Sequence, residues 1–101
     1  MSKVHLEILS SLVETIDTNI KKDKIILEQE IEEGITVNGL LNRLSIKYQR
    51  FGEVIFDVKA QKQTERVNIF LNGRNLELEN GLSTILSDGD TLTFITPIVG
   101  G

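Results

Sequence analysis

Polar and apolar residues alternate in two stretches of the first third of the chain. The first covers residues 4–8, and the second covers the isoleucine-rich residues 24–31. A period of two is typical of a strand with one buried face, so we predict a strand in each stretch. Residues 10–22 between them are polar and weakly patterned, and residues 17–19 within them are interpreted as a loop.

A helical spacing follows the second predicted strand. Five residues recur at offsets of three, four, seven and eleven and therefore share one face of a helix. They are Val37, Leu40, Leu41, Leu44 and Tyr48. Thr36 precedes them and has the hydroxyl of a typical helix N-cap. The pattern predicts a helix over residues 37–48.

The second half of the chain predicts three more strands. Residues 66–71 form the first, and Asn72-Gly73 is a strong signal for a type I′ hairpin turn, which needs positive φ at both positions. Residues 74–78 return as a short strand, and residues 91–95 form the last one before Pro97. Proline has no N–H group, so it ends the hydrogen-bonding capacity of the strand.

Residues 49–63 have no clear period. Phe51-Gly52 is interpreted as a break, and the apolar residues 54–56 should pack somewhere. The complete order of elements predicts an α+β fold, with a mixed sheet of four or five strands and one main helix on one face. We expect one domain over residues 1–95, followed by an extended tail over residues 96–101. The expected core includes Leu6, Ile8, Leu40, Leu41, Leu44, Ile69, Leu92 and the aromatic residues Phe70 and Phe94.

Composition removes several classes of function. The 101 residues include no cysteine and a single histidine, His5, which excludes disulfides, thiolate or histidine-cluster metal sites, and Ser/His triads. The net charge is −4, with carboxylates concentrated in residues 28–33, so nucleic acid is an unfavourable partner. No apolar run approaches the ~18 residues of a membrane span, and we expect a cytoplasmic protein without membrane contact. Asp88 and Asp90 flank a glycine and are interpreted as turn residues, not as cation ligands.

The sequence ends in Gly100-Gly101, shortly after the last predicted strand. A carboxylate becomes an acyl donor when it enters an ATP site, is adenylated and is then attacked by a nucleophile. A side chain next to the reacting carbonyl would crowd that attack, and glycine avoids it. We therefore predict that the Gly101 carboxylate is the reactive group and that Gly100 gives it access.

Five residues are predicted to contact partner proteins. Parity along the last strand places Ile95 opposite the presumed core residues Leu92 and Phe94, on the face away from the helix. The returning strand offers a second apolar candidate on that face, and the tail offers three more. The set is Leu76, Ile95, Pro97, Ile98 and Val99.

Several segments, in order along nearly the whole chain, resemble the sulfur-carrier family that includes the molybdopterin synthase small subunit (MoaD type) and the thiamine sulfur carrier (ThiS type). The helix start alone is a weak signal, whereas the aspartate-glycine-aspartate turn together with the terminal diglycine is fairly specific. The matching segments are residues 3–4, 33–37, 40–41, 67–73, 86–90, 92, 94 and 97–101.

This resemblance implies a ubiquitin-like β-grasp and a carrier that is not itself an enzyme. By it, an ATP-dependent enzyme similar to the ubiquitin-activating type adenylates Gly101, and the product becomes a thiocarboxylate. ATP then belongs to the activating enzyme, and the carrier binds no cofactor. In the molybdopterin branch, which the length and residues 49–63 favour, the tail inserts into a larger subunit that uses the sulfur for molybdenum or tungsten cofactor synthesis.

The sequence departs from that family at three positions. Thr96 stands where the family usually has a second proline. His5 and Glu7 occupy outward positions of the first strand that are commonly apolar in the molybdopterin branch. The acceptor is therefore either the molybdopterin synthase large subunit or another enzyme. Two alternatives to a carrier stay open: a ubiquitin-like modifier joined to lysines through Gly101, and a plain β-grasp interaction module.

Overall fold

The computed structural model describes residues 2–97. The elements in chain order are β1 (Ser2–Leu9), the 3₁₀ helix η1 (Ser10–Thr15), β2 (Lys24–Ile31), α1 (Val37–Lys47), α2 (Phe51–Val54), β3 (Phe56–Asp57), β4 (Lys62–Gln63), β5 (Asn68–Leu71), β6 (Arg74–Asn75), the 3₁₀ helices η2 (Leu76–Leu78) and η3 (Gly81–Ser83), and β7 (Thr91–Ile95).

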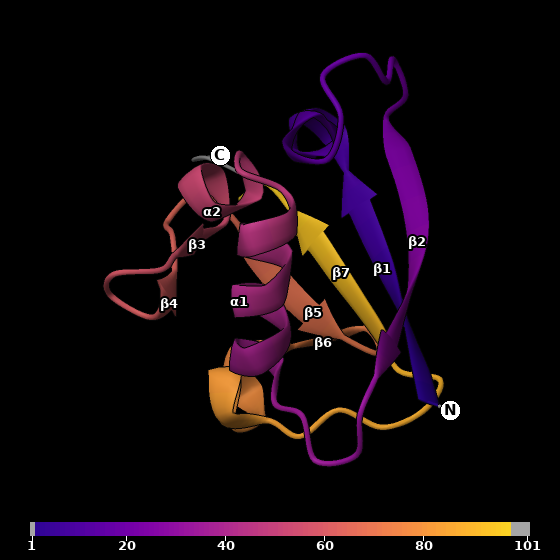
Figure 1. Ribbon diagram of the computed structural model, residues 1–101, viewed down its shortest axis with the longest axis vertical. Helices are drawn as coiled ribbons and strands as arrows, with labels where there is room; N and C mark the ends of the chain where they lie inside the picture. The colour runs from indigo at the N-terminus through magenta and orange to yellow at the C-terminus, as the bar shows by residue number, and fades with distance from the viewer. Residues whose placement is uncertain (1, 98–101) are drawn as a thin grey trace.

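Five strands form one mixed sheet in the order β2-β1-β7-β5-β6. β1 runs antiparallel to β2 and parallel to β7, while β5 is antiparallel to both β7 and β6. α1 crosses one face of this sheet, and β3 and β4 form a small separate ribbon beside it (Figure 1). The predicted mixed sheet with one main helix is confirmed.

The core lies between α1 and the sheet. Alternate residues of β1, β5 and β7 point toward the helix, which matches the period of two in their sequences. Phe51 at the start of α2 closes one end of the core and meets Phe94 edge to face, with ring centroids 5.6 Å apart. Seven core residues named from the sequence are buried: Leu6, Ile8, Leu40, Leu41, Leu44, Ile69 and Leu92. Phe94 is buried too, whereas Phe70 is only half-buried, on the opposite face.

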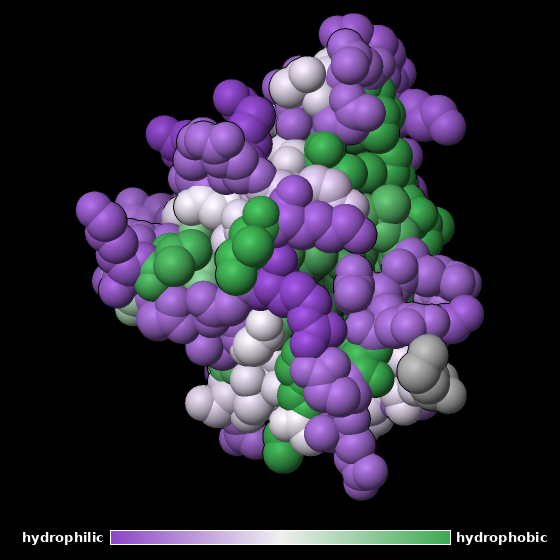
Figure 2. All heavy atoms as spheres, viewed as in Figure 1, coloured by the Kyte–Doolittle hydropathy of each residue, from purple (hydrophilic) through white to green (hydrophobic). Residues whose placement is uncertain are grey.

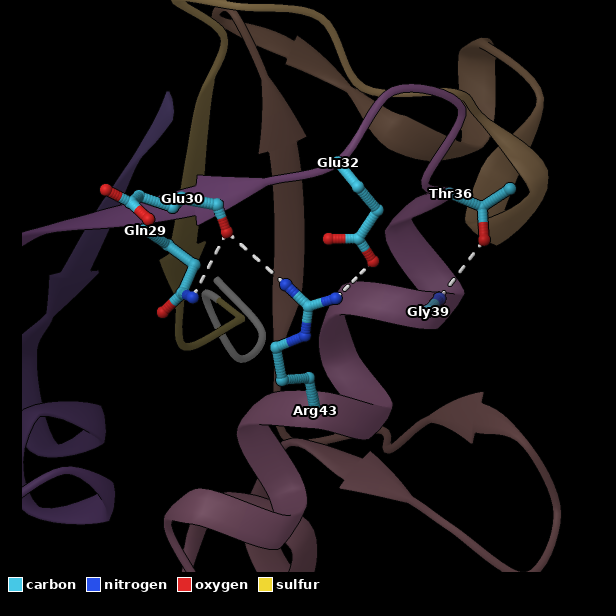
Figure 3. A network of polar contacts seen from close by, with 6 residues as sticks. All are labelled: Gln29, Glu30, Glu32, Thr36, Gly39 and Arg43. Carbon is cyan, nitrogen blue, oxygen red and sulfur yellow. Dashed lines mark hydrogen bonds and ion pairs between the residues drawn. The ribbon is translucent and has the colours of Figure 1, made fainter. Parts of the chain in front are cut away.

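α1 begins at the predicted cap and is tied to the end of β2. The Gly39 N–H donates to Thr36 Oγ1 over 3.1 Å. One turn later, Arg43 reaches across to β2 (Figure 3), where its Nη1 donates to the Glu30 carbonyl over 3.3 Å and its Nη2 pairs with the Glu32 carboxylate. This contact links the second turn of α1 to the end of β2.

The structure adds one short element that the sequence did not predict and contradicts two local predictions. Residues 10–15, for which the sequence predicted no element, form η1 because Leu12 and Val13 turn inward to close the core, and the loop predicted over residues 17–19 is confirmed. Phe51-Gly52 starts α2 and does not break the chain. The strand expected over residues 74–78 ends at Asn75, after which η2 begins. The Asn72-Gly73 turn is confirmed, with φ of 51° and 84°.

Candidate functional site at the base of the C-terminal tail

β7 leads into the C-terminal tail from inside the sheet. It pairs with β1 from Thr91 to Phe94 and with β5 up to Ile95. A strand bonded on both sides is held more firmly than an edge strand, so the point where the tail leaves the sheet is rigid. η1 and α2 lie at this same end of the sheet (Figure 1).

A hollow of about 500 Å³ lies beside the first tail residues. Its wall combines three parts of the chain that are far apart in sequence: η1, the α2 region and the segment before β5. Buried Leu12 and half-buried Val54 give it an apolar part, and exposed charged side chains of both signs form its rim. The lining residues are Ser11, Leu12, Glu14, Thr15, Arg50, Val54, Glu65, Arg66, Thr96 and Pro97.

Local hydrogen bonds and packing hold these walls in place. The Thr15 hydroxyl, in a buried side chain, donates to the Leu12 carbonyl over 2.7 Å and so closes the η1 turn. On the other side, the Thr64 N–H donates to the Ile55 carbonyl over 2.9 Å, which ties the segment before β5 to the end of α2. These contacts hold η1 and the segment before β5 in place around the hollow.

The residues predicted to contact partners lie in different environments in the structure. Pro97 lines the hollow, and Ile95 is half-buried on the face away from α1, as parity predicted. Leu76 was wrongly placed on that face. Its side chain is 1% exposed, because β6 ends at Asn75 and the chain turns Leu76 into the core. Four predicted site residues lie outside the described residues: Ile98, Val99, Gly100 and Gly101.

Sequence reasoning did not find the charged rim of the hollow. Arg50 and Glu65 lie in or next to the segment that has no readable period, and Glu14 lies in η1, for which the sequence predicted no element. None of these residues belongs to a motif. Only the folding of η1, α2 and the segment before β5 against one another reveals that they surround the start of the tail.

Glu7 lies on the outward face of the sheet, as predicted, and is paired within the chain. The Thr93 hydroxyl donates to Glu7 Oε1 over 2.8 Å, and Lys24 Nζ lies 3.0 Å from Glu7 Oε2. The hydrogen bond from Lys24, which has the larger effect, and the one from Thr93 hold the pKa of Glu7 below its ordinary value of 4.5. Burial raises this pKa by a smaller amount. The polar character of this face is therefore a stabilised feature of the fold.

The aspartates at the other end of the sheet have structural roles. Asp88 Oδ1 accepts from the Lys3 N–H over 2.8 Å, and Asp90 accepts from both the Ser87 N–H and the Asn72 side-chain amide. These bonds hold the turn before β7 against β1 and the hairpin turn. The interpretation of Asp88 and Asp90 as turn residues is confirmed. Within residues 2–97, no three His, Cys, Asp or Glu side chains are grouped as metal ligands would be.

A helix that crosses a membrane must be both long and apolar. Over residues 2–97, none of the helices combines the length and the apolar character that a membrane crossing requires.

Known proteins are similar to this chain in sequence. Residues 17–101 match the model of the ThiS family. The sulfur carrier protein CysO of Mycobacterium tuberculosis is 29% identical over 69 residues, which cover 67% of this chain and 74% of that protein. Small archaeal modifier protein 3 of Haloferax volcanii is 31% identical over 72 residues, covering 70% of this chain and 75% of that protein.

Solved structures share the fold. The small archaeal modifier protein 1 from Methanosarcina acetivorans has a TM-score of 0.70 at 28% identity, covering 100% of this chain and 98% of that one. The putative molybdopterin converting factor, subunit 1, from Pyrococcus furiosus has a TM-score of 0.71 at 24% identity, covering 97% and 100%. A chain of the BexX/CysO complex from Amycolatopsis orientalis has a TM-score of 0.62 at 18% identity, covering 95% and 99%.

The family match covers the helix, the hairpin, β7 and the tail, and the solved neighbours have the same ubiquitin-like sheet and helix. The chain therefore belongs to the ThiS family, a group of small β-grasp proteins that includes sulfur carriers and ubiquitin-like modifiers.

Proposed function

We propose that this protein is a sulfur carrier, with residues 96–101 as a tail whose Gly101 carboxylate is converted to a thiocarboxylate. The observation that carries this proposal is the family match, which continues through Gly101, together with the sulfur carrier among the relatives. The geometry supports it, because β7 delivers Thr96 and Pro97 from a rigid position in the sheet. The folded domain is then the part that partner enzymes hold.

The reaction takes place in the active sites of partner enzymes and uses two substitutions. In the first, a carboxylate oxygen of Gly101 attacks the α-phosphorus of ATP, and pyrophosphate leaves. In the second, a hydrosulfide-equivalent sulfur attacks the carbonyl carbon of the acyl adenylate, AMP leaves, and a proton is released. The carbonyl carbon has then exchanged one oxygen for sulfur, and glycine leaves its approach unobstructed.

The hollow beside Pro97 is the contact surface that we propose for these partners. An apolar centre with a charged rim is the usual arrangement of a protein interface. Arg50 and Arg66 can pair with carboxylates of a partner, and Glu14 and Glu65 with its cations. The Amycolatopsis orientalis neighbour, which comes from a complex with BexX, supports docking of this fold on another protein.

Intact-mass measurement tests the proposal. With ATP, a cognate activating enzyme and a sulfide donor, we expect the chain to gain the mass difference between sulfur and oxygen, located at Gly101. Deletion of Gly101 and the Gly100→Val substitution should both abolish this gain. Ile46→Ala, on the exposed side of α1, is the control and should be sulfurated normally. Sulfuration of the chain that lacks Gly101 would contradict the proposal.

A protein modifier is the second candidate, and the 31% identity to small archaeal modifier protein 3 favours it. Adenylation precedes both outcomes, so the two candidates differ only in the nucleophile that attacks the acyl group. A modifier forms an isopeptide bond between Gly101 and a target lysine. Proteolytic mapping of lysine adducts in cells distinguishes the two candidates. Isopeptide adducts without any thiocarboxylate would contradict the carrier proposal and support the modifier.

We propose the molybdopterin synthase large subunit as the sulfur acceptor. The support is the resemblance described above and a fold shared with the Pyrococcus furiosus neighbour. Glu7 is the obstacle, since a carboxylate is costly to desolvate in an apolar interface, although Lys24 beside it reduces that cost. We expect Glu7→Leu to tighten binding to a large subunit with an apolar contact face. Unchanged affinity in calorimetry would place Glu7 outside the contact.

A further inference from the structure

β2 is an edge strand, and its unpaired side can be assigned residue by residue. The His5 N–H donates to the carbonyl of Asp90, just before β7, so the main-chain groups of His5 point to the side of β1 away from β2. Successive residues of a strand direct their main-chain groups to opposite sides, so Leu6 faces β2. Leu6 lies opposite Leu27, so odd-numbered residues of β2 bond β1. The main-chain groups of Lys24, Ile26, Glu28 and Glu30 therefore point outward.

One end of this outer side is already occupied. The Glu30 carbonyl accepts from Arg43 Nη1 over 3.3 Å and from Gln29 Nε2 over 3.2 Å (Figure 3). Within residues 2–97, strand pairing leaves the outer side of β2 without a neighbour. The free stretch is thus limited to three residues with outward main-chain groups: Lys24, Ile26 and Glu28.

Three consecutive apolar side chains, at residues 25–27, lie between the charged Lys24 and Glu28 on this edge. Ile26 is 57% exposed on the face away from α1, and Ile25 and Leu27 are only half-buried on the helix face. Figure 2 shows apolar side chains gathered along this side of the molecule, over β2. Strand edges are commonly protected by charged side chains, proline, a bulge or a covering segment, and of these β2 has the charged side chains of Lys24 and Glu28. β2 has no proline, and its pairing with β1 is regular over all eight positions.

We propose that β2 pairs antiparallel with β2 of a second copy, about a twofold axis that passes between the two Ile26 residues. In this register Ile26 lies opposite its own copy, and Lys24 lies opposite Glu28 of the partner subunit. All three pairs are hydrogen-bonded pairs, because each joins residues with outward main-chain groups. Ile25 meets the partner subunit's Leu27 on the helix face. The result is one continuous sheet across two molecules.

Charge and the Arg43 contact select this register. Side chains directly opposite on one face interact, and the chosen pairing gives two Lys24–Glu28 pairs of opposite charge, beside the pairs that Lys24 forms with Glu7 and Glu28 with Lys3 within each molecule. The neighbouring register places exposed Ile26 opposite the partner subunit's Glu28. It also requires the Glu30 carbonyl, which Arg43 and Gln29 already hold. The free stretch is therefore complementary to itself in one alignment.

This contact is compatible with the proposed function and does not depend on it. β2 is the first strand of the sheet and β7 the third, so the base of the tail lies about 10 Å from the pairing edge. Lys24, Ile26 and Glu28 do not line the hollow beside Pro97, so the two proposed contacts use different residues. Loss of dimerisation would leave the sulfuration of Gly101 unchanged, so the two proposals fail separately.

Charge reversal with complementation tests the pairing. We expect sedimentation velocity to show wild-type mass rising from monomer toward dimer between about 1 µM and about 1 mM. Lys24→Glu and Glu28→Lys should each weaken association by at least about tenfold, because two attractive pairs become two repulsive ones. An equimolar mixture of the two variants should dimerise again, since every pair across that interface is of opposite charge.

Two further variants make the result decisive. Lys62→Glu, an exposed charge reversal on β4, should associate like the wild type. Ile26→Lys places two cations at the twofold axis without touching the core, and it should be monomeric with an unchanged thermal unfolding curve. A wild type that stays monomeric throughout, a folded Ile26→Lys variant that still dimerises, or a mixture of folded charge variants that stays monomeric would overturn the proposal.

Discussion

Glu7 shows what a single outward-facing residue contributes to this sheet. Its carboxylate lies between a hydroxyl of β7 and the ammonium group of Lys24 on β2, so it links three strands. The pKa of Glu7 is lowered by Lys24 and then by Thr93, which means that the folded protein favours the charged form. The unfolded chain binds its proton more readily than the folded chain does.

Glu7→Gln should therefore destabilise the protein in a pH-dependent way. Above pH 4.5 the carboxylate contribution is fully present, and it is lost as the pH falls through the lower pKa of the folded state. We expect the variant to lose about 0.2–1 kcal/mol of unfolding free energy at neutral pH, as is usual for a partly exposed pair. Urea unfolding of both proteins above and well below pH 4.5 measures this. A difference that is the same at both values would contradict it.

At the scale of elements, the two sides of α1 contribute very differently to the stability of the fold. Leu41 is fully buried against the sheet, whereas Ile46 on the same helix is 87% exposed. Both are apolar and similar in size, so hydrophobicity alone does not distinguish them. Their positions around the helix do, because only residues on the stripe of period 3.6 face the sheet.

Leu41→Ala should cost about 2–5 kcal/mol of unfolding free energy, because it removes buried methyl groups and leaves a cavity. The matched control Ile46→Ala loses almost no buried surface and should change stability by less than about 0.5 kcal/mol. Chemical denaturation of the two variants in parallel gives both values. Similar losses at the two positions would mean that the helix is oriented differently from the structure.

At the scale of the whole molecule, the hollow beside Pro97 is assembled from distant segments. Arg50 near α2 and Arg66 before β5 both line the hollow where the tail begins. Their side chains are exposed, so the fold does not need them. Together with Glu14 and Glu65 they are available for the proposed contact with a partner protein.

The double substitution Arg50→Ala/Arg66→Ala should weaken recognition by the activating enzyme without unfolding the domain. We expect the KM for the carrier to rise by about five- to tenfold, corresponding to roughly 1 kcal/mol for lost charged contacts. Lys62→Ala, an exposed cation on β4, is the control and should leave KM unchanged. Steady-state adenylation kinetics with each variant measures the effect. An unchanged KM for the double variant would remove the hollow from the docking surface.

Much of the fold could be predicted from local sequence patterns. β2 and β7 have the predicted bounds, α1 differs by one residue, and the Asn72-Gly73 turn has the required positive φ values. These features depend on short-range physics: side-chain periodicity, helix capping and the steric freedom of glycine. The ThiS family could be recognised for a related reason, since each of its motifs is a short segment that can be found without knowing the fold.

Tertiary structure alone decided the features in which distant segments meet. η1 and α2 are too short for their periodicity to be read, and they fold because Leu12 and Phe51 are buried against the sheet. Leu76 became a core residue because packing ended β6 early and turned the chain inward. The hollow beside Pro97 and the outward main-chain groups of β2 arise from strand order and register, and these depend on which segments lie next to one another in space.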